Sequence, residues 1–341
     1  MNTVSLVGID LGKHCFHLHA QDASGRMAYR KKLTRSQMFM LLGNTPRCVV
    51  AMEACAGAHW IARRIQALGH EPRLISPQFV KPFRQGNKND FADAQAICGA
   101  ASRPNMRFVS AHNETQQTLS AMHRVRERLV RERTGTVNQI HAFLLEFGVS
   151  LPRGMAVIRR LPAVLASEPL PARLIALLER LQAHFRYLDE QLAQLERELL
   201  AQLHEDERSE RLLEIPGIGP ITASVLMSEL GDARQYGSAR QFAASIGLVP
   251  RQYSTGGKPT LLGISKRGDR NLRRLLVQCA RVIMLRIEQR TDRLGVWVHR
   301  LLARRHSNVV ACALANKLAR IAWAILAKGT HYRSEPAVPA A

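Results

Sequence analysis

The sequence is poor in acidic and aromatic residues. Of its 341 residues, 27 are Asp or Glu against 49 Lys or Arg, which gives a formal net charge of +22. Aromatic residues make up only 5%, which argues against an aromatic-rich membrane barrel or a lectin. Hydrophobic residues reach 46%, enough for sizeable cores, so the chain as a whole is not disordered. The positive charge predicts a large polyanionic partner, which in a soluble protein is nucleic acid.

Long uncharged hydrophobic runs are also missing. The most apolar late stretch, residues 309–326, carries Lys317 and Arg320 in its middle, which makes it a poor membrane span. The N-terminus has no basic region followed by an apolar run, so we expect no secretory signal. These features predict a soluble cytoplasmic protein with no membrane partner.

Paired cysteines are absent as well, because no two of the six are spaced as CxxC. A zinc ribbon is therefore excluded, and we expect six buried free thiols in a reducing compartment. A histidine-rich stretch near the N-terminus does not have the spacing of a structural zinc site either, so we expect no zinc there. The cysteines are Cys15, Cys48, Cys55, Cys98, Cys279 and Cys312, and the histidine-rich stretch holds His14, Cys15, His17 and His19.

Charge divides the chain into three regions. Residues 1–110 carry 15 basic and 6 acidic side chains, residues 111–205 carry 12 and 11, and residues 206–341 carry 22 and 10. Two basic regions thus flank a nearly neutral one, as expected if the ends bind nucleic acid and the middle binds protein. We predict domains at 1–110, 111–205 and 206–330, with a disordered tail at 331–341.

The first region is predicted to be α/β. Three closely spaced strand-like runs, 4–9, 15–20 and 27–32, form an antiparallel meander, with a turn at 22–25 between the last two. Helix-like stretches at 35–42 and 59–68 then alternate with strand-like runs at 48–53 and 72–76. A meander followed by alternating strands and helices is typical of a mixed sheet with helices packed on it.

The middle region is predicted to be helical. From Leu174 to Leu199, apolar residues recur with the spacing 4-3-4-3-4-3-4, which is an unbroken heptad seam. Residues 118–147 form a weaker second helix, which a proline-containing stretch at 151–171 separates from the seam. Either an intramolecular helical hairpin or a dimerising coiled coil fits this pattern, and we favour dimerisation because sustained heptads are the coiled-coil signal. The seam residues are Leu174, Leu178, Leu181, Phe185, Leu188, Leu192, Leu195 and Leu199.

Four carboxylates of the first region are placed as a metal site would require. Asp10 and Glu53 end strand-like runs, and Asp90 and Asp93 lie three residues apart at the start of a helix, on one face. Oxygen ligands suit hard cations, and two Mg²⁺ ions ~4 Å apart can stabilise both the attacking and the leaving oxygen of a phosphodiester displacement. We therefore predict a site for two Mg²⁺ ions, although Asp90 alone could be a helix cap.

The last region carries two further nucleic-acid signals. Two glycines at spacing two, Gly217 and Gly219, lie between apolar residues before a helix, as in a helix-hairpin-helix motif that contacts the DNA backbone; the alternative is an ordinary helix turn. On the helix after residue 268, Arg270, Arg274 and Arg281 lie opposite an apolar face, and we predict that they contact phosphate rather than only solvent.

These motifs together resemble one family. The order Gly-Ile-Asp-Leu-Gly at 8–12, strand-end Glu53 and Lys-Asn-Asp-Phe-Ala-Asp-Ala at 88–94 resembles the RuvC-like, RNase H-fold domain of the DEDD transposases of bacterial insertion sequences of the IS-one-hundred-and-ten type. Piv-type DNA invertases are relatives. Residues 215–219 and 247–258 resemble the C-terminal transposase domain of that family. The resemblance covers the chain except the tail after about residue 330.

The resemblance implies a fold and an activity. The fold is a RuvC-like mixed-sheet domain, a helical coiled-coil middle and a mostly helical C-terminal transposase domain. Asp10, Glu53, Asp90 and Asp93 would be the DEDD metal ligands, and a C-terminal serine would become joined to DNA phosphate. A bridge RNA would guide a homodimer, assembling to a tetramer, to double-stranded DNA at the element ends and the target.

Ser254 is the serine that matches the family pattern, in Tyr-Ser-Thr-Gly-Gly-Lys at 253–258. Thr255 departs from the commoner second serine. Nearby Lys258 would offset transition-state charge, and Lys266 and Arg267 would add phosphate contacts. The alternatives are Ser265 as the nucleophile, or a hairpin turn whose hydroxyls only bond backbone.

Two other functions compete with recombination. A RuvC-like endonuclease would hydrolyse phosphodiesters with the metal site alone, and a non-enzymatic nucleic-acid-binding scaffold would need no intact site. The four acids argue against the scaffold. The Tyr-Ser-Thr-Gly-Gly-Lys segment argues against simple hydrolysis, which requires only water and metal.

Overall fold

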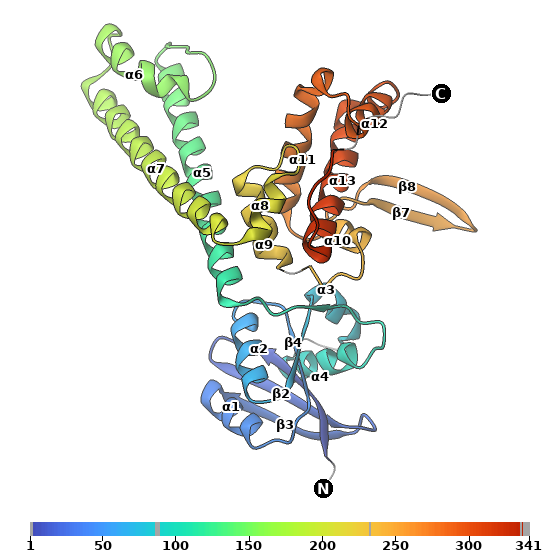
Figure 1. The fold of residues 1–341 in the computed structure, drawn as a ribbon. Helices are drawn as coiled ribbons and strands as arrows, with labels where there is room; N and C mark the ends of the chain where they lie inside the picture. Colours follow the sequence, from blue (N-terminus) through green and yellow to red (C-terminus); the bar gives the residue numbers. More distant parts are fainter. Residues whose placement is uncertain (1–2, 86–88, 232, 335, 337–341) are drawn as a thin grey trace, which may run out of the picture. The chain divides into compact units, whose positions relative to one another are not determined.

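The computed structural model describes residues 3–85, 89–231, 233–334 and 336. Contacts within the chain divide it into two compact units, Met1–Glu114 and Thr115–Ala341. The boundary lies close to the predicted end of the first region at residue 110. Figure 1 shows the mixed strands and helices of the first unit and the mostly helical second unit. The predicted combination of a mixed-sheet N-terminal domain with a mostly helical C-terminal part is confirmed.

A six-stranded mixed sheet forms the centre of the first unit, in the order β3-β2-β1-β4-β5-β6. The first three strands form the predicted antiparallel meander, and β4 and β5 run parallel to β1. The short β6 pairs antiparallel with β5. The strands are β1 (Val4–Leu11), β2 (Cys15–Asp22), β3 (Met27–Thr34), β4 (Val49–Glu53), β5 (Glu71–Ile75) and β6 (Phe108–Val109).

Helices cover both faces of this sheet because its central strands are apolar on both sides. The face with Val7 and Ile9 packs against α1 and α2, whereas Ala51 and Ile75 pack against Ile97 of α4 on the other face. The elements around the sheet are α1 (Arg35–Gly43), α2 (Ala58–Ala67), α3 (Pro77–Val80), η1 (Lys81–Phe83) and α4 (Asp90–Ala101).

Gly8 in β1 allows α4 to lie unusually close to the sheet. A Cβ atom at this position would lie 2.4 Å from the carbonyl oxygen of Ala94 and 2.7 Å from the Sγ of Cys98. Any other residue would therefore push α4 outward. The close approach places the start of α4 beside the end of β1, where Asp10 lies.

A long helical hairpin opens the second unit, formed by α5 (Glu114–Glu146), α6 (Ala156–Ser167) and α7 (Ala172–His204). Leu178 and Phe185 of the α7 seam pack with Ile140 and Leu144 of α5. Arg126 of α5 and Glu196 of α7 form an ion pair at 2.6 Å, and Arg133 pairs with Asp189 in the same way. The seam is thus covered within the chain. The structure thus shows the intramolecular hairpin, one of the two arrangements predicted for this pattern, whereas dimerisation stays a prediction.

The rest of the second unit is one helical core with a protruding two-stranded hairpin (Figure 1). Leu119 of α5 and Leu199 and Leu203 of α7 are part of this core. No domain boundary therefore falls at residues 205–206, because the base of the helical hairpin is packed into the C-terminal region. The elements are α8 (Glu207–Leu213), α9 (Pro220–Leu230), α10 (Ala239–Ser245), β7 (Pro250–Thr255), β8 (Lys258–Ile264), α11 (Arg270–Leu285), η2 (Ile287–Gln289), α12 (Arg293–Leu302) and α13 (Ser307–Lys328).

Helix α13 is the one helix among the described residues that is long and apolar enough to cross a membrane, judged by length and composition alone. Half of its most apolar window is buried inside the structure, and Leu314, Ala315 and Leu318 are fully buried in the core. A core helix of a globular unit passes the same test, so this helix is accounted for by the packing of the unit.

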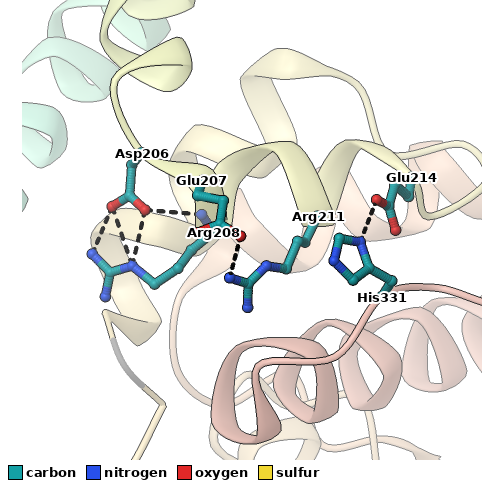
Figure 2. A network of polar contacts seen from close by, with 6 residues as sticks. All are labelled: Asp206, Glu207, Arg208, Arg211, Glu214 and His331. Atoms are coloured by element: carbon teal, nitrogen blue, oxygen red, sulfur yellow. Dashed lines mark hydrogen bonds and ion pairs between the residues drawn. The ribbon is translucent and has the colours of Figure 1, made fainter.

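Two smaller expectations differ from the structure. Cys15 and Cys55 are exposed and Cys312 is half-buried, so only three of the six thiols are buried as predicted. The start of the predicted disordered tail is packed, since His331 bonds the Glu214 carboxylate at 2.7 Å (Figure 2). The backbone N–H of Tyr332 donates to the same carboxylate at 3.0 Å. The rest of that tail, residues 335 and 337–341, lies outside the described residues.

Candidate functional site

Strand pairing brings Asp10 and Glu53 to the same edge of the sheet. Asp10 is the penultimate residue of β1 and Glu53 is the last residue of β4. The two strands are parallel neighbours, with Ile9 opposite Met52. Carboxyl ends of parallel strands meet at one edge, so both carboxylates lie where α4 begins.

Asp90 and Asp93 lie in the first turn of α4, as predicted. Asn89 caps this helix, because its side chain accepts a hydrogen bond from the backbone N–H of Phe91 at 2.9 Å. Asp90 is therefore not the cap residue. One helical turn places the two carboxylates on the same face, with Asp93 buried and Asp90 exposed.

Three of the four predicted acids form a tight cluster. Oxygen atoms of Asp10, Asp90 and Asp93 all lie within 4.8 Å of one another. Glu53 is joined to this cluster through Arg84, whose guanidinium lies 3.1 Å from the Glu53 carboxylate and 2.9 Å from that of Asp93. Lys88, which begins the sequence motif, lies outside the described residues.

His17 is a second basic neighbour of the acids. Its Nδ1 lies 3.6 Å from the Asp90 carboxylate, and its ring packs edge-on against Phe91 at 4.8 Å between centroids. The residue lies directly opposite Asp10 in the β1–β2 pair. Pairing of the first two strands of the predicted meander could therefore have placed His17 beside the acids. No spacing in the sequence indicates that Arg84 contacts them.

The electrostatics of the cluster favour a cation. Burial, followed by the negative charges of Asp93, Asp90 and Glu53, raises the pKa of Asp10 above its ordinary value. A bound divalent cation would offset this mutual repulsion, and clustered carboxylate oxygens are the ligands that hard cations prefer. The donor set therefore fits a divalent metal held by Asp10, Asp90 and Asp93, with Glu53 beside them.

Ser254 lies on the protruding β7–β8 hairpin. Every residue of β7 is exposed, and the Ser254 hydroxyl accepts a hydrogen bond from Gln252 Nε2 at 2.8 Å. A two-residue hairpin turn of this type requires positive φ at both central residues, a conformation that glycine adopts readily. Gly256 and Gly257 have φ values of +57° and +77°. The hairpin presents Ser254 to solvent on a short strand that buries nothing itself.

Lys258 is placed differently from our expectation. It pairs with Thr255 across the hairpin, whereas Ser254 pairs with Pro259. Cross-strand partners share a face and adjacent residues alternate between faces, so Lys258 lies on the opposite face from Ser254. A direct charge-offsetting role of Lys258 beside the serine is therefore not supported by this register.

Ser265 lies where the chain returns from the hairpin to the core. Its backbone N–H donates to the carbonyl of Val249 at 2.8 Å, and its hydroxyl is buried with no hydrogen-bond partner among the described residues. A buried hydroxyl is out of reach of a DNA phosphate. The alternative nucleophile is therefore disfavoured by burial, which its sequence does not reveal.

The Gly217–Gly219 segment connects α8 to α9. Gly217 has φ +76°, and a Cβ there would lie 2.8 Å from the carbonyl oxygen of Cys279 on α11. Gly219 caps α9 with φ −97° and has open space around it. Pro220 occupies the first turn of α9, so that turn offers one backbone N–H fewer to a phosphate.

The predicted arginine face is found on α11. Leu272, Leu276, Cys279 and Ile283 are buried in the core, whereas all three predicted arginines are exposed. Arg274 bonds the Asn271 side chain at 2.6 Å, and Arg281 bonds Asn308 at 3.2 Å. The three residues are Arg270, Arg274 and Arg281.

Lys266 and Arg267 lie in the loop before this helix, and both are exposed. Lys266 has a positive φ of +57°, which is unusual for a residue other than glycine. The loop is packed so closely against residues 245–247 that a Cβ on Gly268 would lie 1.8 Å from the carbonyl oxygen of Ser245. This close packing fixes the path of the two basic residues.

Comparison with known proteins agrees with this architecture. A family model described as a transposase of the IS116/IS110/IS902 family matches residues 209–294, and a transposase model for the DEDD proteins of IS110 elements matches residues 7–148. The transposase for insertion sequence element IS1328 of Yersinia enterocolitica is 60% identical over 97% of this chain and 99% of that protein.

Two further relatives match over nearly their full length. A probable family 20 transposase of Pseudomonas aeruginosa is 48% identical over 97% of this chain and 99% of its own, and the transposase for insertion sequence element IS1111A of Coxiella burnetii is 40% identical over 98% and 92%. The fold and the acid cluster define a DEDD-type enzyme that cuts and rejoins DNA. The chain belongs to the IS110 family of insertion-sequence transposases.

Proposed function

We propose that this transposase cuts DNA through a covalent bond between Ser254 and a DNA phosphate, with Mg²⁺ as the metal of the DEDD site. The observation that carries the proposal is the contrast between the exposed hydroxyl of Ser254 and the buried hydroxyl of Ser265. A nucleophile that attacks a large substrate must be accessible. Of the two candidate serines, only Ser254 meets this requirement.

The covalent step balances in bonds and protons. The Ser254 oxygen attacks the phosphorus of a phosphodiester and loses its proton to solvent, while the departing deoxyribose oxygen takes up a proton. Attack by another deoxyribose hydroxyl on the phosphoserine reverses these changes and joins the new strand. The energy of the phosphodiester bond is conserved throughout, so no ATP is required.

The DEDD residues have a separate role. Asp10, Glu53, Asp90 and Asp93 would hold two Mg²⁺ ions, which supply Lewis-acid stabilisation of charge at phosphate oxygens when bound. Arg84 and His17 contact these carboxylates and keep them oriented while offsetting part of their charge.

Basic residues of the second unit would position the nucleic acid. The exposed arginines of α11 and the residues of the preceding loop are suited to phosphate contacts, and the α8–α9 turn would contact the DNA backbone as in a helix-hairpin-helix motif. The residues assigned this role are Gly217, Gly219, Lys258, Lys266, Arg267, Arg270, Arg274 and Arg281.

We also propose that a bridge RNA guides the protein and that homodimers assemble into a tetramer on DNA. The net charge of +22 supports the binding of a second large polyanion, such as an RNA, in addition to DNA. The RNA would be found by sequencing nucleic acid that copurifies with the protein. Recovery of a structured RNA encoded beside the gene supports the proposal, and recovery of only bulk cellular RNA contradicts it.

Trapping a protein–DNA adduct tests the covalent mechanism. The protein is incubated with element-end DNA in Mg²⁺ buffer and denatured, and the linked peptide is identified by mass spectrometry. We expect the link at Ser254, its loss in Ser254→Ala with DNA binding retained, and adduct formation in Ser265→Ala and Thr255→Ala. Free DNA ends made by Ser254→Ala at the wild-type rate would instead support a hydrolytic, RuvC-like nuclease.

A further inference from the structure

A basic pocket lies in the C-terminal core, away from both the acid cluster and the serine hairpin in the sequence. It has a volume of about 720 Å³ and is lined by α12, α13 and the segment that follows α13. This volume is in the range of about 300–1,000 Å³ that is typical of ligand sites. Four of its lining residues are basic, namely Arg293, Arg300, Lys317 and Arg333.

Two regular helix faces form the first two walls. Arg293, Trp297 and Arg300 follow one another at spacings of four and three along α12, which places them on one face. Ile321 and Ala324 follow Lys317 on α13 with the same spacing. Both walls therefore consist of packed helices whose side chains converge on one space.

The segment after α13 forms the third wall and is anchored at both ends. Glu214, at the end of α8, bonds His331 Nδ1 at 2.7 Å and the backbone N–H of Tyr332 at 3.0 Å, as seen in Figure 2 for the His331 contact. The hydroxyl of Ser334 donates to Asp292 Oδ2 at 3.0 Å. These bonds hold Tyr332 and Arg333 against the pocket.

The charges in this pocket are unbalanced. Its one acidic lining residue, Asp292, already accepts hydrogen bonds from Arg290 at 2.5 Å and from the backbone of Gly295 at 2.9 Å. Arg300, Lys317 and Arg333 form no ion pair within the described part of the chain. Three cations that form no ion pair with Asp292 favour the binding of an anion.

Lys317 shows how crowded these cations are. Its ammonium lies 4.6 Å from the centre of the Trp297 ring, which is within the range of a cation–π attraction. Burial, followed by the nearby charges of Arg320 and Arg293, lowers the pKa of Lys317 below its ordinary value. A phosphate beside Lys317 would relieve this repulsion.

Most of the other side chains that line the pocket are apolar or aromatic. Trp297 and Tyr332 are half-buried, and Ile321 and Ala324 follow Lys317 along the α13 face. Nucleobases stack on aromatic side chains, whereas a carboxylate-bearing peptide would use only the cations. A base within a duplex remains stacked on its neighbours and is not available to such a wall.

We propose that this pocket binds an unpaired nucleotide of a nucleic-acid strand. The phosphate contacts Arg300, Lys317 and Arg333, and the base lies against the wall formed by Trp297 and Tyr332. The inference rests on the nucleic-acid-processing function of the family and is independent of Ser254 and of the metal site. It gives the second unit a means of distinguishing distorted or looped strands from plain duplex.

Binding of three matched DNA hairpins tests this proposal by fluorescence anisotropy. One hairpin carries a single bulged nucleotide, one carries an abasic bulge and one is fully paired. We expect the bulged base to improve affinity about tenfold over the abasic bulge, because stacking of a base on aromatic side chains contributes this much or more. Equal affinity for the two bulged hairpins would overturn the proposal.

Variants identify the pocket as the origin of that preference. Tyr332→Ala should remove most of the tenfold preference, and Trp297→Phe should retain it, whereas Arg300→Ala should lower the affinity for both bulged hairpins because both keep the phosphate. Arg305→Ala is the matched control, because Arg305 is exposed and outside the pocket yet removes the same charge. Equal losses in Arg300→Ala and Arg305→Ala would mean that only general charge matters, which contradicts the proposal.

Two further readouts separate this proposal from others. Melting curves of each variant establish that it is folded, and DNA cleavage by Tyr332→Ala on fully paired DNA reports the covalent mechanism independently. An acidic peptide that competes for the pocket better than a nucleoside monophosphate would assign the site to a protein partner and overturn the proposal. Competition by the nucleoside monophosphate, but not by inorganic phosphate at equal concentration, supports it.

Discussion

Single residues decide whether four acids can share one site. Arg84 bridges Glu53 and Asp93, and His17 approaches Asp90. Burial, followed by the charges of Asp93, Asp90 and Glu53, raises the pKa of Asp10, and His17 opposes this shift. Clustered carboxylates without such neighbours would be protonated or displaced. The cluster is therefore best described as four acids and two bases, of which the DEDD signature names only the acids.

Asp93→Asn should abolish DNA cleavage and leave DNA binding within about threefold of wild type, since we assign the residue to metal and not to phosphate. The same change should remove the increase in melting temperature that Mg²⁺ gives the wild-type protein, because binding to the folded state is what stabilises it. Asp22→Asn, a half-buried acid at the end of β2 and outside the cluster, serves as control. Full cleavage by Asp93→Asn would contradict the metal-site assignment.

Glu229 on α9 gives a pH-dependent stability that is separate from the active site. Burial, followed by the charge of Asp269, raises the pKa of Glu229 to about 7, whereas Arg124 opposes the shift. The folded protein therefore keeps this proton up to near neutral pH, while the unfolded chain loses it at the ordinary value. Stability should consequently fall as the pH rises from about 4.5 to 7.

Glu229→Gln should remove this penalty. We expect a higher melting temperature than wild type at pH 8 and an equal one at pH 4, where the carboxyl group is protonated in both states. Glu190→Gln on the exposed face of α7 is the matched control and should change neither value. A variant that melts below wild type at pH 8 would show that the ionised carboxylate is stabilising after all.

At the scale of elements, the α7 seam is satisfied by α5 in the same chain. Leu188 and Leu192 are only 2% and 3% exposed, which leaves no room for a partner helix at these positions. An ion pair between α5 and α7 on the flank, Arg126 with Glu196, further fixes the hairpin. If homodimers form, their contacts must use surfaces other than this seam.

Replacing both Leu188 and Leu192 with Arg should therefore unfold the helical hairpin. Two buried charges without partners cost several kcal/mol, so we expect lower helical content and a lower melting temperature that do not depend on protein concentration. Leu177→Arg with Tyr187→Arg, on the exposed face of α7, should be tolerated. Retained helicity with loss of a dimer in light scattering would restore the dimerising interpretation.

At the scale of the whole molecule, the net charge of +22 should make nucleic-acid binding strongly salt-dependent. If about 8 phosphates are neutralised, raising salt from about 50 to 200 mM should lower affinity by on the order of 10⁴. Arg270→Ala and Arg274→Ala should each flatten the slope of log affinity against log salt by about one unit. An unchanged slope in both variants would mean that the exposed face of α11 contacts only solvent.

The sequence by itself determined much of the fold and of the metal site. The meander of short strands, the acids at strand ends and the amphipathic pattern of α11 all depend on local periodicity, and each is found where the pattern predicts it. Asp90 and Asp93 needed only the geometry of one helical turn. The composition alone determines the net positive charge, which predicts a nucleic-acid partner.

Tertiary structure alone decided what covers each face and which groups are accessible. A heptad seam specifies an apolar stripe but not the helix that buries it, so α5 and not a second chain covers α7. The sequence around Ser265 does not reveal that its hydroxyl is buried, and strand register alone separates Lys258 from Ser254. Arg84 meets Glu53 across 31 residues, because contacts between distant segments depend on how the elements pack and leave no local periodicity to read.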